Sequence, residues 1–389
     1  MTSNWVKSTL GELSIGGRGY YGIGASAVPY SAELYTYLRI TDINDDGTLN
    51  MSDLKSVSDE KATDYLLKPN DIVFARTGAS TGRNYFYDGT DGEFVFAGFL
   101  IKFSLDPKKV NPRYIKYYCI SKDYRDWVAA FNTGSTRGNI NAQTLASMPI
   151  SLPDRATQNR IVKVLDAIEE KRKSNAKIND NLADLLQTIY QERFSNDILA
   201  VNQGVLSDIC SYSRDKVAVS ELNVSTYFST ENMLSGKAGS TEATSLPTTS
   251  QTTACHKGDT LISNIRPYFK KIVYCEGNCG CSTDVLCFTP SQPRYSTYLF
   301  STLYADKFFA FMVAGSKGTK MPRGDKQQIM TYPVVLPSEE ELARFNTIAS
   351  PLLEQIYSNR AENKRLSILR DTLLPKLMSG EIDVSAVQL

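Results

Sequence analysis

Apolar and polar positions alternate over short distances through most of the chain. Runs of Val, Ile, Phe and Tyr are separated by Gly, Asn, Asp and Pro, which predicts short β-strands joined by turns. Residues 112–131 and 294–313 differ, because their aromatic and aliphatic residues recur at helical spacing, and they are expected to form core helices. The pattern therefore predicts an α+β fold whose globular parts are mostly β.

Two further segments carry another pattern, in which apolar residues recur at alternating intervals of three and four around a polar centre. This spacing is typical of a coiled-coil seam, and each helix could run for about 35–40 residues, or roughly 50–60 Å. Neither helix can bury its apolar stripe alone, so we expect an antiparallel pair, although each helix could instead pack only on its own domain. Asn residues buried in the seam would fix its register. The predicted pairing residues are Ile161, Leu165, Ile168, Asn175, Asn179, Leu182, Leu186 and Ile189 in the first helix, and Phe345, Ile348, Leu352, Asn359, Asn363, Leu366, Leu369 and Leu373 in the second.

The chain contains an internal repeat. The stretch "ISLPDRATQNRIV" (150–162) returns as "VVLPSEEELARFN" (334–346), and a shift of 184 residues aligns the two stretches and the helices after them. Upstream the shift is 188, where "NDIVFA" (70–75) faces "GDTLIS" (258–263). If the two helices pair antiparallel, the repeated halves are expected to be related by a pseudo-two-fold axis. The predicted parts are a first globular domain (1–153), a first spacer helix (154–196), a second globular domain (197–337), a second spacer helix (338–380) and a tail (381–389).

Composition narrows the class of protein. With 389 residues and 42% hydrophobic content, the chain is long and apolar enough for two or more packed domains. Its formal net charge of +1 excludes a globally basic protein, so any nucleic-acid contact must rest on local patches. The seven cysteines are odd in number and scattered, which favours reduced thiols. No segment resembles a membrane helix or a signal peptide, so a cytoplasmic location without a membrane partner is expected.

Several enzyme signatures occur in the sequence without the context that they need. "GRGYYG" (17–22) has the glycine spacing of a dinucleotide-binding loop, but Pro29 interrupts the helix that must follow it. Pro153 and Asp154 resemble part of a nuclease metal site, but the second copy has Ser338 in place of the aspartate. Asp154 is better explained as the residue that caps the start of a helix. The sequence therefore predicts no catalytic residues.

One cysteine-rich stretch resembles a zinc site in composition. "CEGNCGC" (275–281) lies near Cys255, His256 and Cys287 in the sequence, but its spacing is not that of paired CxxC ligands. The matching residues 87–93 of the first copy contain no cysteine, and a fold that stands without ligands in one copy should need none in the other. His256, the single histidine, is expected at the surface rather than as a catalytic base. We predict no metal site and no cofactor.

Two basic, glycine-containing loops recur at equivalent places in both copies, one after the strand at 70–75 or 258–263 and one before each "LP" junction. Glycine lets the backbone approach phosphates, Ser and Thr donate to phosphate oxygens, and Arg or Asn can address base edges. A solvated turn is the ordinary alternative, but occurrence in both copies favours DNA contact. The candidate DNA-binding residues are Arg76, Thr77, Ser80, Thr81, Arg83, Ser135, Thr136, Arg137, Asn139 and Asn141 in the first copy, and Asn264, Arg266, Tyr268, Lys270, Lys271, Lys317, Thr319, Lys320, Arg323 and Lys326 in the second.

The whole pattern resembles the DNA-specificity subunit of type I restriction-modification systems. The resemblance covers essentially the whole chain and rests on the alternation of domains and helices, on "NDIVFARTGASTG" (70–82) and above all on "GTKMPRGDKQQIMTYPVVLP" (318–337). The first copy departs from the pattern at "GSTRGNINAQ" (134–143), where the second has a longer loop, so the DNA contacts of the first copy are placed less securely.

The resemblance implies two target-recognition domains, each binding one half of a bipartite site on double-stranded DNA. It also implies that two methyltransferase subunits clamp onto this chain, that restriction endonuclease subunits can join, and that adenine methylation and ATP-dependent cleavage belong to those partners. The chain itself would then be no enzyme. Equivalent groove faces of DNA recur about every 34 Å, so helices of roughly 50–60 Å could hold two readers over separate half-sites. Competing classes are an autonomous DNA methyltransferase or nuclease, and a coiled-coil adaptor that never touches DNA.

Overall fold

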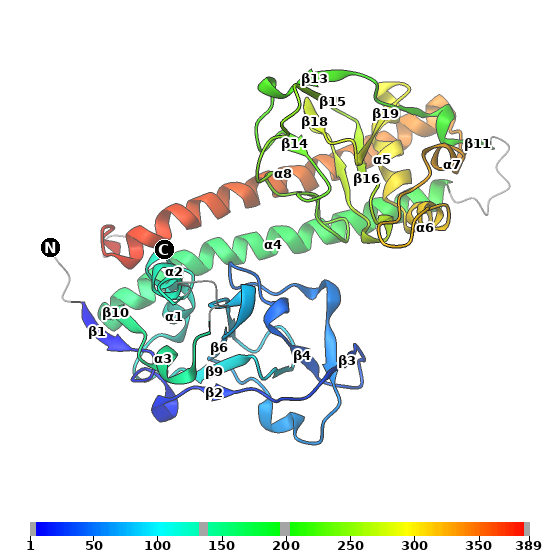
Figure 1. The fold of residues 1–389 in the computed structure, drawn as a ribbon. Helices are drawn as coiled ribbons and strands as arrows, with labels where there is room; N and C mark the ends of the chain where they lie inside the picture. Colours follow the sequence, from blue (N-terminus) through cyan, green and yellow to red (C-terminus); the bar gives the residue numbers. More distant parts are fainter. Residues whose placement is uncertain (1–4, 132–138, 195–202, 385–389) are drawn as a thin grey trace. The chain divides into compact units, whose positions relative to one another are not determined.

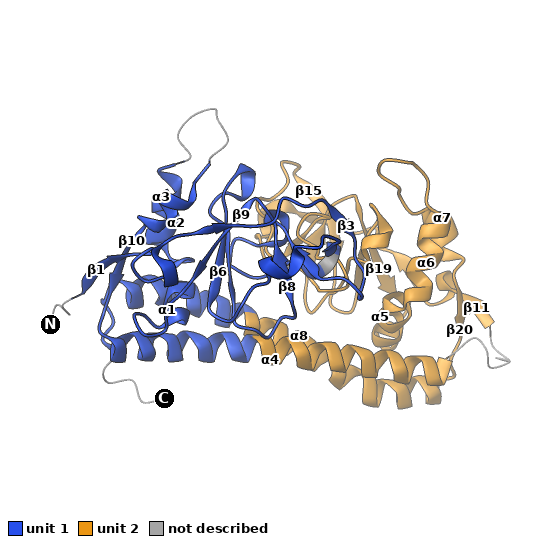
Figure 2. Cartoon of the chain, turned by 90° about the horizontal axis from the view of Figure 1, so that it is seen from below, with its two compact units in different colours: residues 1–172, 364–389 blue, residues 173–363 orange. Residues whose placement is uncertain are grey.

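The structure is a computed structural model that describes residues 5–131, 139–194 and 203–384 (Figure 1). The fold is α+β, as predicted, and it divides into two compact units. Unit 1 comprises residues 1–172 and 364–389, and unit 2 comprises residues 173–363 (Figure 2). Two helices of 40 residues, α4 (Arg155–Phe194) and α8 (Glu339–Met378), each contribute one part to unit 1 and the other part to unit 2.

Unit 1 contains two four-stranded sheets and a two-stranded ribbon. The first sheet has the strand order β2-β9-β6-β7, the second has the order β3-β5-β4-β8, and β1 pairs with β10 in the ribbon. Only β4 and β8 run parallel among these pairs. The elements are β1 (Val6–Thr9), β2 (Tyr20–Tyr21), β3 (Ala27–Pro29), β4 (Thr36–Leu38), β5 (Lys55–Val57), β6 (Asp71–Ala75), β7 (Asn84–Tyr87), β8 (Phe94–Phe96), β9 (Leu100–Ser104), α1 (Pro112–Tyr118), α2 (Lys122–Ala129), α3 (Ala142–Ala146) and β10 (Pro149–Leu152).

Unit 2 repeats this architecture. Its sheets have the orders β12-β19-β16-β17 and β13-β15-β18-β14, and β11 pairs with β20. The second sheet differs in one respect, because β18 pairs with β15, whereas in unit 1 the corresponding neighbour of β5 is β4. The elements are β11 (Gln203–Val205), β12 (Cys210–Tyr212), β13 (Lys216–Ala218), β14 (Tyr227–Phe228), β15 (Gln251–Cys255), β16 (Thr260–Ser263), β17 (Ile272–Tyr274), β18 (Cys279–Cys281), β19 (Val285–Pro290), α5 (Ser296–Tyr304), α6 (Asp306–Ala314), α7 (Lys326–Met330) and β20 (Pro333–Val335).

Strand β6 is the centre of the core of unit 1, and all five of its residues are buried. Ile72 and Phe74 face a cluster that includes side chains of the helices, while Val73 and Ala75 face the second sheet. A strand covered on both faces reads as a continuous apolar run, which is why "DIVFA" lacks the alternation of a half-exposed strand. Strand β16 is buried on both faces of unit 2 in the same way.

The two segments predicted as core helices each form a pair of short helices, α1 with α2 and α5 with α6. In unit 1 the break falls at Ser121, whose hydroxyl caps α2 by accepting from the N–H of Tyr124. Tyr114 and Tyr117 of α1 are fully buried, and burial raises the pKa of both phenols. These helices cover the first sheet and supply aromatic core.

Both long helices begin at a side-chain cap. The carboxylate of Asp154 accepts from the N–H of Thr157 at 2.8 Å, and this hydrogen bond lowers the pKa of Asp154. Ser338 and Glu341 form a reciprocal capping box, in which each side chain accepts from the other residue's N–H. The apparent nuclease motif at Asp154 is therefore a helix start. Within the described ranges, no helix is both long and apolar enough to cross a membrane.

Candidate nucleic-acid interface

Three segments of unit 1 meet around Arg76, the residue that follows strand β6. The N–H of Arg76 donates to the carbonyl of Phe99 at 3.1 Å, and the carbonyl of Arg76 accepts from the N–H of Ile140 at 2.9 Å. Thr77 forms an antiparallel β-bridge with Asn139. The two loops predicted to bind DNA are therefore joined to each other and to the turn between β8 and β9. We call this set of backbone bonds the loop frame of unit 1.

The side chain of Arg76 is held between two aromatic rings. Its guanidinium carbon lies 5.2 Å from the ring centre of Tyr21 and 6.0 Å from that of Phe99. Contacts of this kind attract a cation to the ring face. Tyr21 and Phe99 remain 44% and 56% exposed, and the Tyr21 hydroxyl accepts from the N–H of Ala142 at 3.2 Å. Unit 1 therefore presents an arginine flanked by two exposed rings.

Sequence reasoning missed these rings. Tyr20 and Tyr21 belong to "GRGYYG", the stretch rejected as a dinucleotide loop, and they form β2 at the edge of the first sheet. A Cβ atom at Gly22 would lie 2.3 Å from the carbonyl oxygens of Phe96 and Ala97, so only glycine allows the backbone to pass there. The sequence did contain one signal for an exposed aromatic site, namely two adjacent tyrosines flanked by glycines. The glycine after them is required because the backbone packs closely there.

Other predicted residues of unit 1 are engaged within the unit. The guanidinium of Arg83 forms an ion pair with Asp45 at 2.7 Å and donates to the carbonyl of Ile43 at 3.2 Å. Ser80 is buried, and the hydroxyl of Thr81 donates to the carbonyl of Gly78 at 2.8 Å. These three side chains shape the hairpin that follows Arg76.

The second loop of unit 1 is only partly described. Asn139 is exposed, and Asn141 caps α3 by accepting from the N–H of Thr144 at 2.8 Å. The cap accounts for the asparagine at position 141 without any ligand. The remaining candidates lie outside the described residues, and they are Ser135, Thr136 and Arg137.

Unit 2 has an equivalent loop frame around Asn264, the residue that follows strand β16. The N–H of Asn264 donates to the carbonyl of Asp284 at 2.8 Å, and its carbonyl accepts from the N–H of Gly324 at 3.3 Å. Ile265 forms an antiparallel β-bridge with Arg323. The backbone bonds therefore match those of unit 1, while the side chains at each place are different.

The exposed arginine of this second frame comes from the other loop. Arg323 is 56% exposed at its side chain and pairs with the carboxylate of Asp284 at 3.0 Å. It also forms two backbone hydrogen bonds with Lys317, at 2.9 and 3.0 Å, which close a tight hairpin. Unit 2 therefore presents an arginine held by a carboxylate where unit 1 presents one held by rings.

Backbone strain and unpaired polar atoms mark the same place. Arg266 has φ = 51°, in the left-handed region that a long side chain rarely adopts, and its N–H donates to the carbonyl of Pro322 at 2.8 Å. The Oδ1 atom of Asn264 and the Nε atom of Arg266 are buried and have no hydrogen-bond partner among the described residues. Strain and unsatisfied groups of this kind concentrate at ligand sites.

The other basic residues of the first loop of unit 2 serve mainly within the unit. Lys270 pairs with Asp306 at 2.9 Å, and Lys271 donates to the carbonyl of Thr230 at 2.6 Å. Burial lowers the pKa of Lys271. Tyr268, which is 50% exposed, is the candidate of this loop that reaches the surface most.

The hairpin of unit 2 carries exposed polar side chains. Lys317 pairs with Asp325 at 2.6 Å, and this hydrogen bond raises the pKa of Lys317. Asp325 also caps α7 by accepting from the N–H groups of that helix. Thr319, Lys320 and Lys326 are exposed. The hairpin therefore holds its shape by internal bonds while its tip faces outward.

The cysteine-rich stretch fills part of the core of unit 2, where the matching cluster of unit 1 is lined by Tyr and Phe. The Sγ atoms of Cys275 and Cys279 lie 3.5 Å apart, and the side chain of His256 is half-exposed. Within the described part of the chain, no group of three or more His, Cys, Asp or Glu is arranged to hold a metal ion. The thiols pack as small apolar side chains. The buried free cysteines of this cluster are Cys255, Cys275, Cys279, Cys281 and Cys287.

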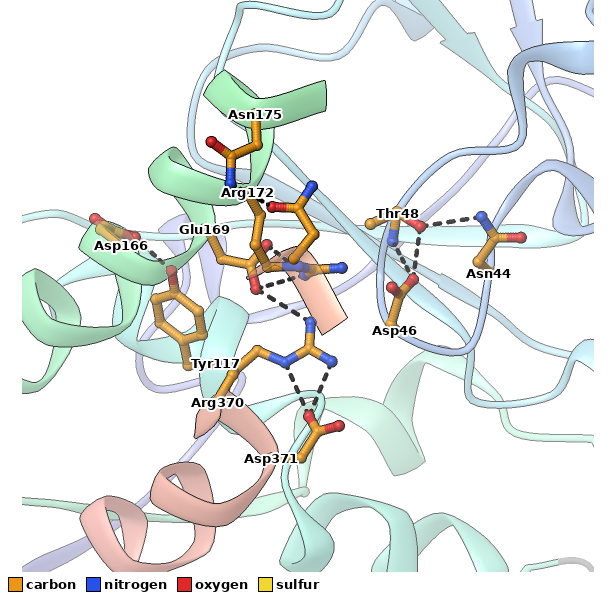
Figure 3. A network of polar contacts seen from close by, with 11 residues as sticks. Asn44, Asp46, Thr48, Tyr117, Asp166, Glu169, Arg172, Asn175, Arg370 and Asp371 are labelled. Atoms are coloured by element: carbon orange, nitrogen blue, oxygen red, sulfur yellow. Dashed lines mark hydrogen bonds and ion pairs between the residues drawn. The ribbon is translucent and has the colours of Figure 1, made fainter. Parts of the chain in front are cut away.

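Polar side chains join the two long helices in unit 1 (Figure 3). Glu169 of α4 accepts from Arg370 of α8 at 3.1 Å, and Arg370 also pairs with Asp371 at 2.8 Å. The side chain of Arg370 is only 10% exposed, so its charge depends on these carboxylates. Tyr117 donates to Asp166 at 2.5 Å and ties α1 to α4. The polar centre of the seam in this unit is ionic.

In unit 2 the polar contacts between the two helices are made mainly by amides. Asn359 donates to Asn179 at 2.9 Å, and Asn175 donates to Asn363 at 3.0 Å and to Glu362 at 2.7 Å. The repeat aligns Asn175 with Asn359 and Asn179 with Asn363, so each asparagine pairs with the counterpart of the other asparagine on its own helix. This crosswise pairing requires the two helices to run antiparallel where these residues meet.

The apolar seam of α8 differs from the predicted one at two positions. Ile348 and Leu369 are 42% and 45% exposed, and their neighbours Ala349 and Arg370 are buried instead. Apart from the asparagines, the prediction counted only large apolar side chains, but a small residue such as Ala349 can also be buried, and Arg370 is buried because it is paired. The other predicted residues are buried or partly buried, and they are Ile161, Leu165, Ile168, Asn175, Asn179, Leu182, Leu186, Ile189, Phe345, Leu352, Asn359, Asn363, Leu366 and Leu373.

The N-terminal part of the chain, which holds the first loop frame and most of α4, matches a known domain family. Residues 2–183 match the family model for the type I restriction modification DNA specificity domain. This part of the chain therefore matches the family that the sequence resemblance predicted.

Individual relatives agree with this assignment. Over 226 residues, 56% of the chain, it is 20% identical to the "Type I restriction enzyme HindI specificity subunit" of Haemophilus influenzae. Over 73 residues, 19% of the chain, it is 34% identical to the "Type I restriction enzyme MjaIX specificity subunit" of Methanocaldococcus jannaschii. These matches span 46% and 17% of the relatives' own lengths, so the chain covers about half of the first relative and less of the second.

The fold also matches a solved structure. The type I restriction-modification S subunit from M. genitalium aligns with a TM-score of 0.54 at 18% identity, over 96% of each chain. At this identity the match concerns the fold alone. It covers both units of the chain, including the part beyond the family model.

Proposed function

We propose that the chain is the DNA-specificity subunit of a type I restriction-modification complex, in which each unit reads one half of a bipartite target on double-stranded DNA. The observation that carries the proposal is the repeated loop frame. The same backbone bonds recur in both units, yet the side chains that they present differ at every compared place. Two loop frames with the same backbone bonds but different side chains are expected if the two units read different half-sites.

The chemistry of each frame suits contact with base edges. Arg76 and Arg323 are at least partly exposed as residues, and neighbours hold their guanidinium groups, so little rotamer entropy is lost when they bind. Arginine commonly donates two hydrogen bonds to guanine in the major groove. The exposed rings of Tyr21 and Phe99 add contacts with sugars or with the methyl group of thymine.

In this proposal the chain has no catalytic group and no cofactor of its own. Adenine methylation and ATP-dependent cleavage would belong to partner subunits, two of them methyltransferases and the others restriction endonucleases, assembled with this chain in the cytoplasm. The long helices would set the spacing between the readers, and the exposed apolar residues Ile178, Leu185, Ile348, Ile368 and Leu369 on α4 and α8 offer docking positions for methyltransferase helices. We retain 1–153 and 197–337 as readers, 154–196 and 338–380 as spacers, and 381–389 as a tail.

Reconstitution with a methyltransferase subunit from the same source tests the proposal. The purified complex is incubated with a pool of duplexes carrying two randomised blocks separated by spacers of varied length, and the bound duplexes are sequenced. The expected result is a bipartite motif with a fixed spacer, together with methylated adenine that depends on both subunits. A motif with one block, or no enrichment at all, would contradict the proposal.

The competing classes give different results in the same assay. An autonomous methyltransferase or nuclease would modify or cut duplexes without its partner. A coiled-coil adaptor would assemble with the methyltransferase but leave its DNA preference unchanged. Omitting each subunit in turn therefore separates all three readings.

A further inference from the structure

The turn before strand β19 places a carboxylate in the loop frame of unit 2. Asp284 closes the frame by accepting from the N–H of Asn264 through its backbone carbonyl at 2.8 Å. Its side chain turns to Arg323, and the two atoms Oδ1 and Nη2 lie 3.0 Å apart. One residue thus contacts both predicted DNA-binding loops, one through its backbone and the other through its side chain.

Arg323 is fixed at both ends. Its backbone is held by the bridge to Ile265 and by two hydrogen bonds to Lys317, and its guanidinium is held by Asp284. The two side chains are still 56% and 38% exposed, so the pair lies at the surface rather than in the core. A surface ion pair of this kind adds little to folding stability.

We propose that Asp284 is a positioning residue that sets the base read by Arg323, an inference that rests on the proposed function. The ion pair engages one Nη group, and the other donors of the guanidinium have no partner among the described residues. These donors can address the O6 and N7 atoms of one guanine in the major groove. A fixed guanidinium discriminates more sharply than a mobile one, because a mobile one can turn to the nearest phosphate instead.

Unit 1 supports the same role for this turn. The residue that closes its frame is Phe99, whose carbonyl accepts from the N–H of Arg76 as that of Asp284 accepts from Asn264. Phe99 contacts the guanidinium of Arg76, just as Asp284 contacts that of Arg323. In both units the turn before the last sheet strand therefore holds the arginine, by a ring in one case and by a charge in the other. Neither turn residue was among the candidates predicted from the sequence.

The test compares Asp284→Ala with the wild-type chain, each in complex with the methyltransferase, on the same pool of randomised duplexes. The expected result is a loss of about tenfold in the preference for guanine at one position of one half-site. Affinity for duplexes that lack the motif should not fall, since the variant removes a negative charge next to DNA. The other half-site and the spacer length should stay unchanged.

Two further variants separate positioning from general damage. Asp284→Glu keeps the charge and should restore part of the lost preference. Glu339→Gln removes the carboxylate partner of Arg294, 2.6 Å away in the same unit, and should leave the motif unchanged. Thermal unfolding of each complex checks that the variants are folded, and Asp284→Asn replaces the alanine variant if that one is not.

The outcomes are distinct. If Asp284→Ala and Asp284→Asn both keep the wild-type motif, or weaken binding to all duplexes equally, the positioning role is wrong while the proposed function stands. If the wild-type complex selects no bipartite motif, the proposed function fails first. A shift confined to one guanine, reversed in part by glutamate, supports the inference.

Discussion

The loop frames of the two units have the same backbone bonds but opposite ways of presenting an arginine. In unit 1 the arginine stands directly after the central strand, at Arg76, and rings hold it. In unit 2 that place is taken by the buried Asn264, and the arginine comes from the hairpin at Arg323, held by a carboxylate. The difference teaches that the hydrogen-bonded backbone fixes where side chains can be presented, while the side chains alone decide what they bind.

The seam of the long helices repeats this lesson. In unit 1 its polar centre is the pair of Glu169 and Arg370, whose counterparts in unit 2 are the buried Leu353 and Leu186. In unit 2 the polar centre is the pair of Asn179 and Asn359. Burial of a helix stripe requires only shape and hydrophobicity, so two leucines can stand where the other unit has an acid and a base. Polar contacts need specific partners, so they can diverge only in pairs.

The largest expected effect is a loss of stability on truncating a buried side chain of the long helices. Phe345 is fully buried against Phe194, Tyr190 and Tyr298, and Phe345→Ala should lower the free energy of unfolding by about 3–5 kcal/mol, because it leaves a cavity. Urea denaturation of the purified chain measures this loss. Ile348→Ala, on the exposed face of the same helix, should change stability by less than about 0.5 kcal/mol. Equal losses in the two variants would mean that the predicted seam, and not the observed one, is correct.

The next effect separates the two polar centres. Glu169→Ala leaves Arg370 buried with Asp371 as its carboxylate partner, and Asn179→Ala removes the acceptor for Asn359. Each change should cost about 1–3 kcal/mol, since a buried polar group loses a partner. Double-mutant cycles in urea, with Arg370→Met and Asn359→Ala as the second changes, measure the coupling within each pair. No coupling in either cycle would show that the centres do not fix the pairing.

Much of this scaffold was predictable from the sequence, for physical reasons. The repeat, the helix starts and the "DIVFA" strand follow from local rules of burial, capping and periodicity, which leave marks within a few residues. The burial of Arg370 was not predictable, because it depends on Glu169, about two hundred residues earlier in the chain. A charged residue gives no sign of burial until its partner is placed beside it.

The candidate site was predictable only in part. Both loops were identified because glycine and basic residues mark them, and their joining by backbone bonds was not. Tyr21, Phe99 and Asp284 were missed, since each comes from a segment without basic character and reaches the loops only through the fold. Arg83 and Lys271 were named for their charge, yet the structure engages both within their units.

A smaller and more local effect should follow from changing the arginine of unit 1. Arg76→Ala removes the group held between Tyr21 and Phe99 and should weaken discrimination at one base pair of one half-site by about 1–3 kcal/mol. Selection from the randomised duplex pool, in complex with the methyltransferase, gives the motif base by base. Arg83→Ala is the matched control, because that arginine is engaged by Asp45 and should leave the motif as it is. Loss of preference in the half-site that also responds to Arg323→Ala would mean that the units do not read separately.

The smallest effect is expected at the hairpin tip of unit 2. Lys320 is exposed and, unlike Arg323, has no carboxylate partner among the described ion pairs, so we expect it to contact phosphate rather than a base. Lys320→Ala should weaken binding to all duplexes alike and reduce the slope of log affinity against log salt concentration by about 0.9, the value for one phosphate contact. Titrations of the complex at several salt concentrations, on selected and unselected duplexes, measure both. If Lys320→Ala instead altered a single base of the motif, the hairpin tip would be a reader, and the division between a presented arginine and an anchoring lysine in unit 2 would have to be abandoned.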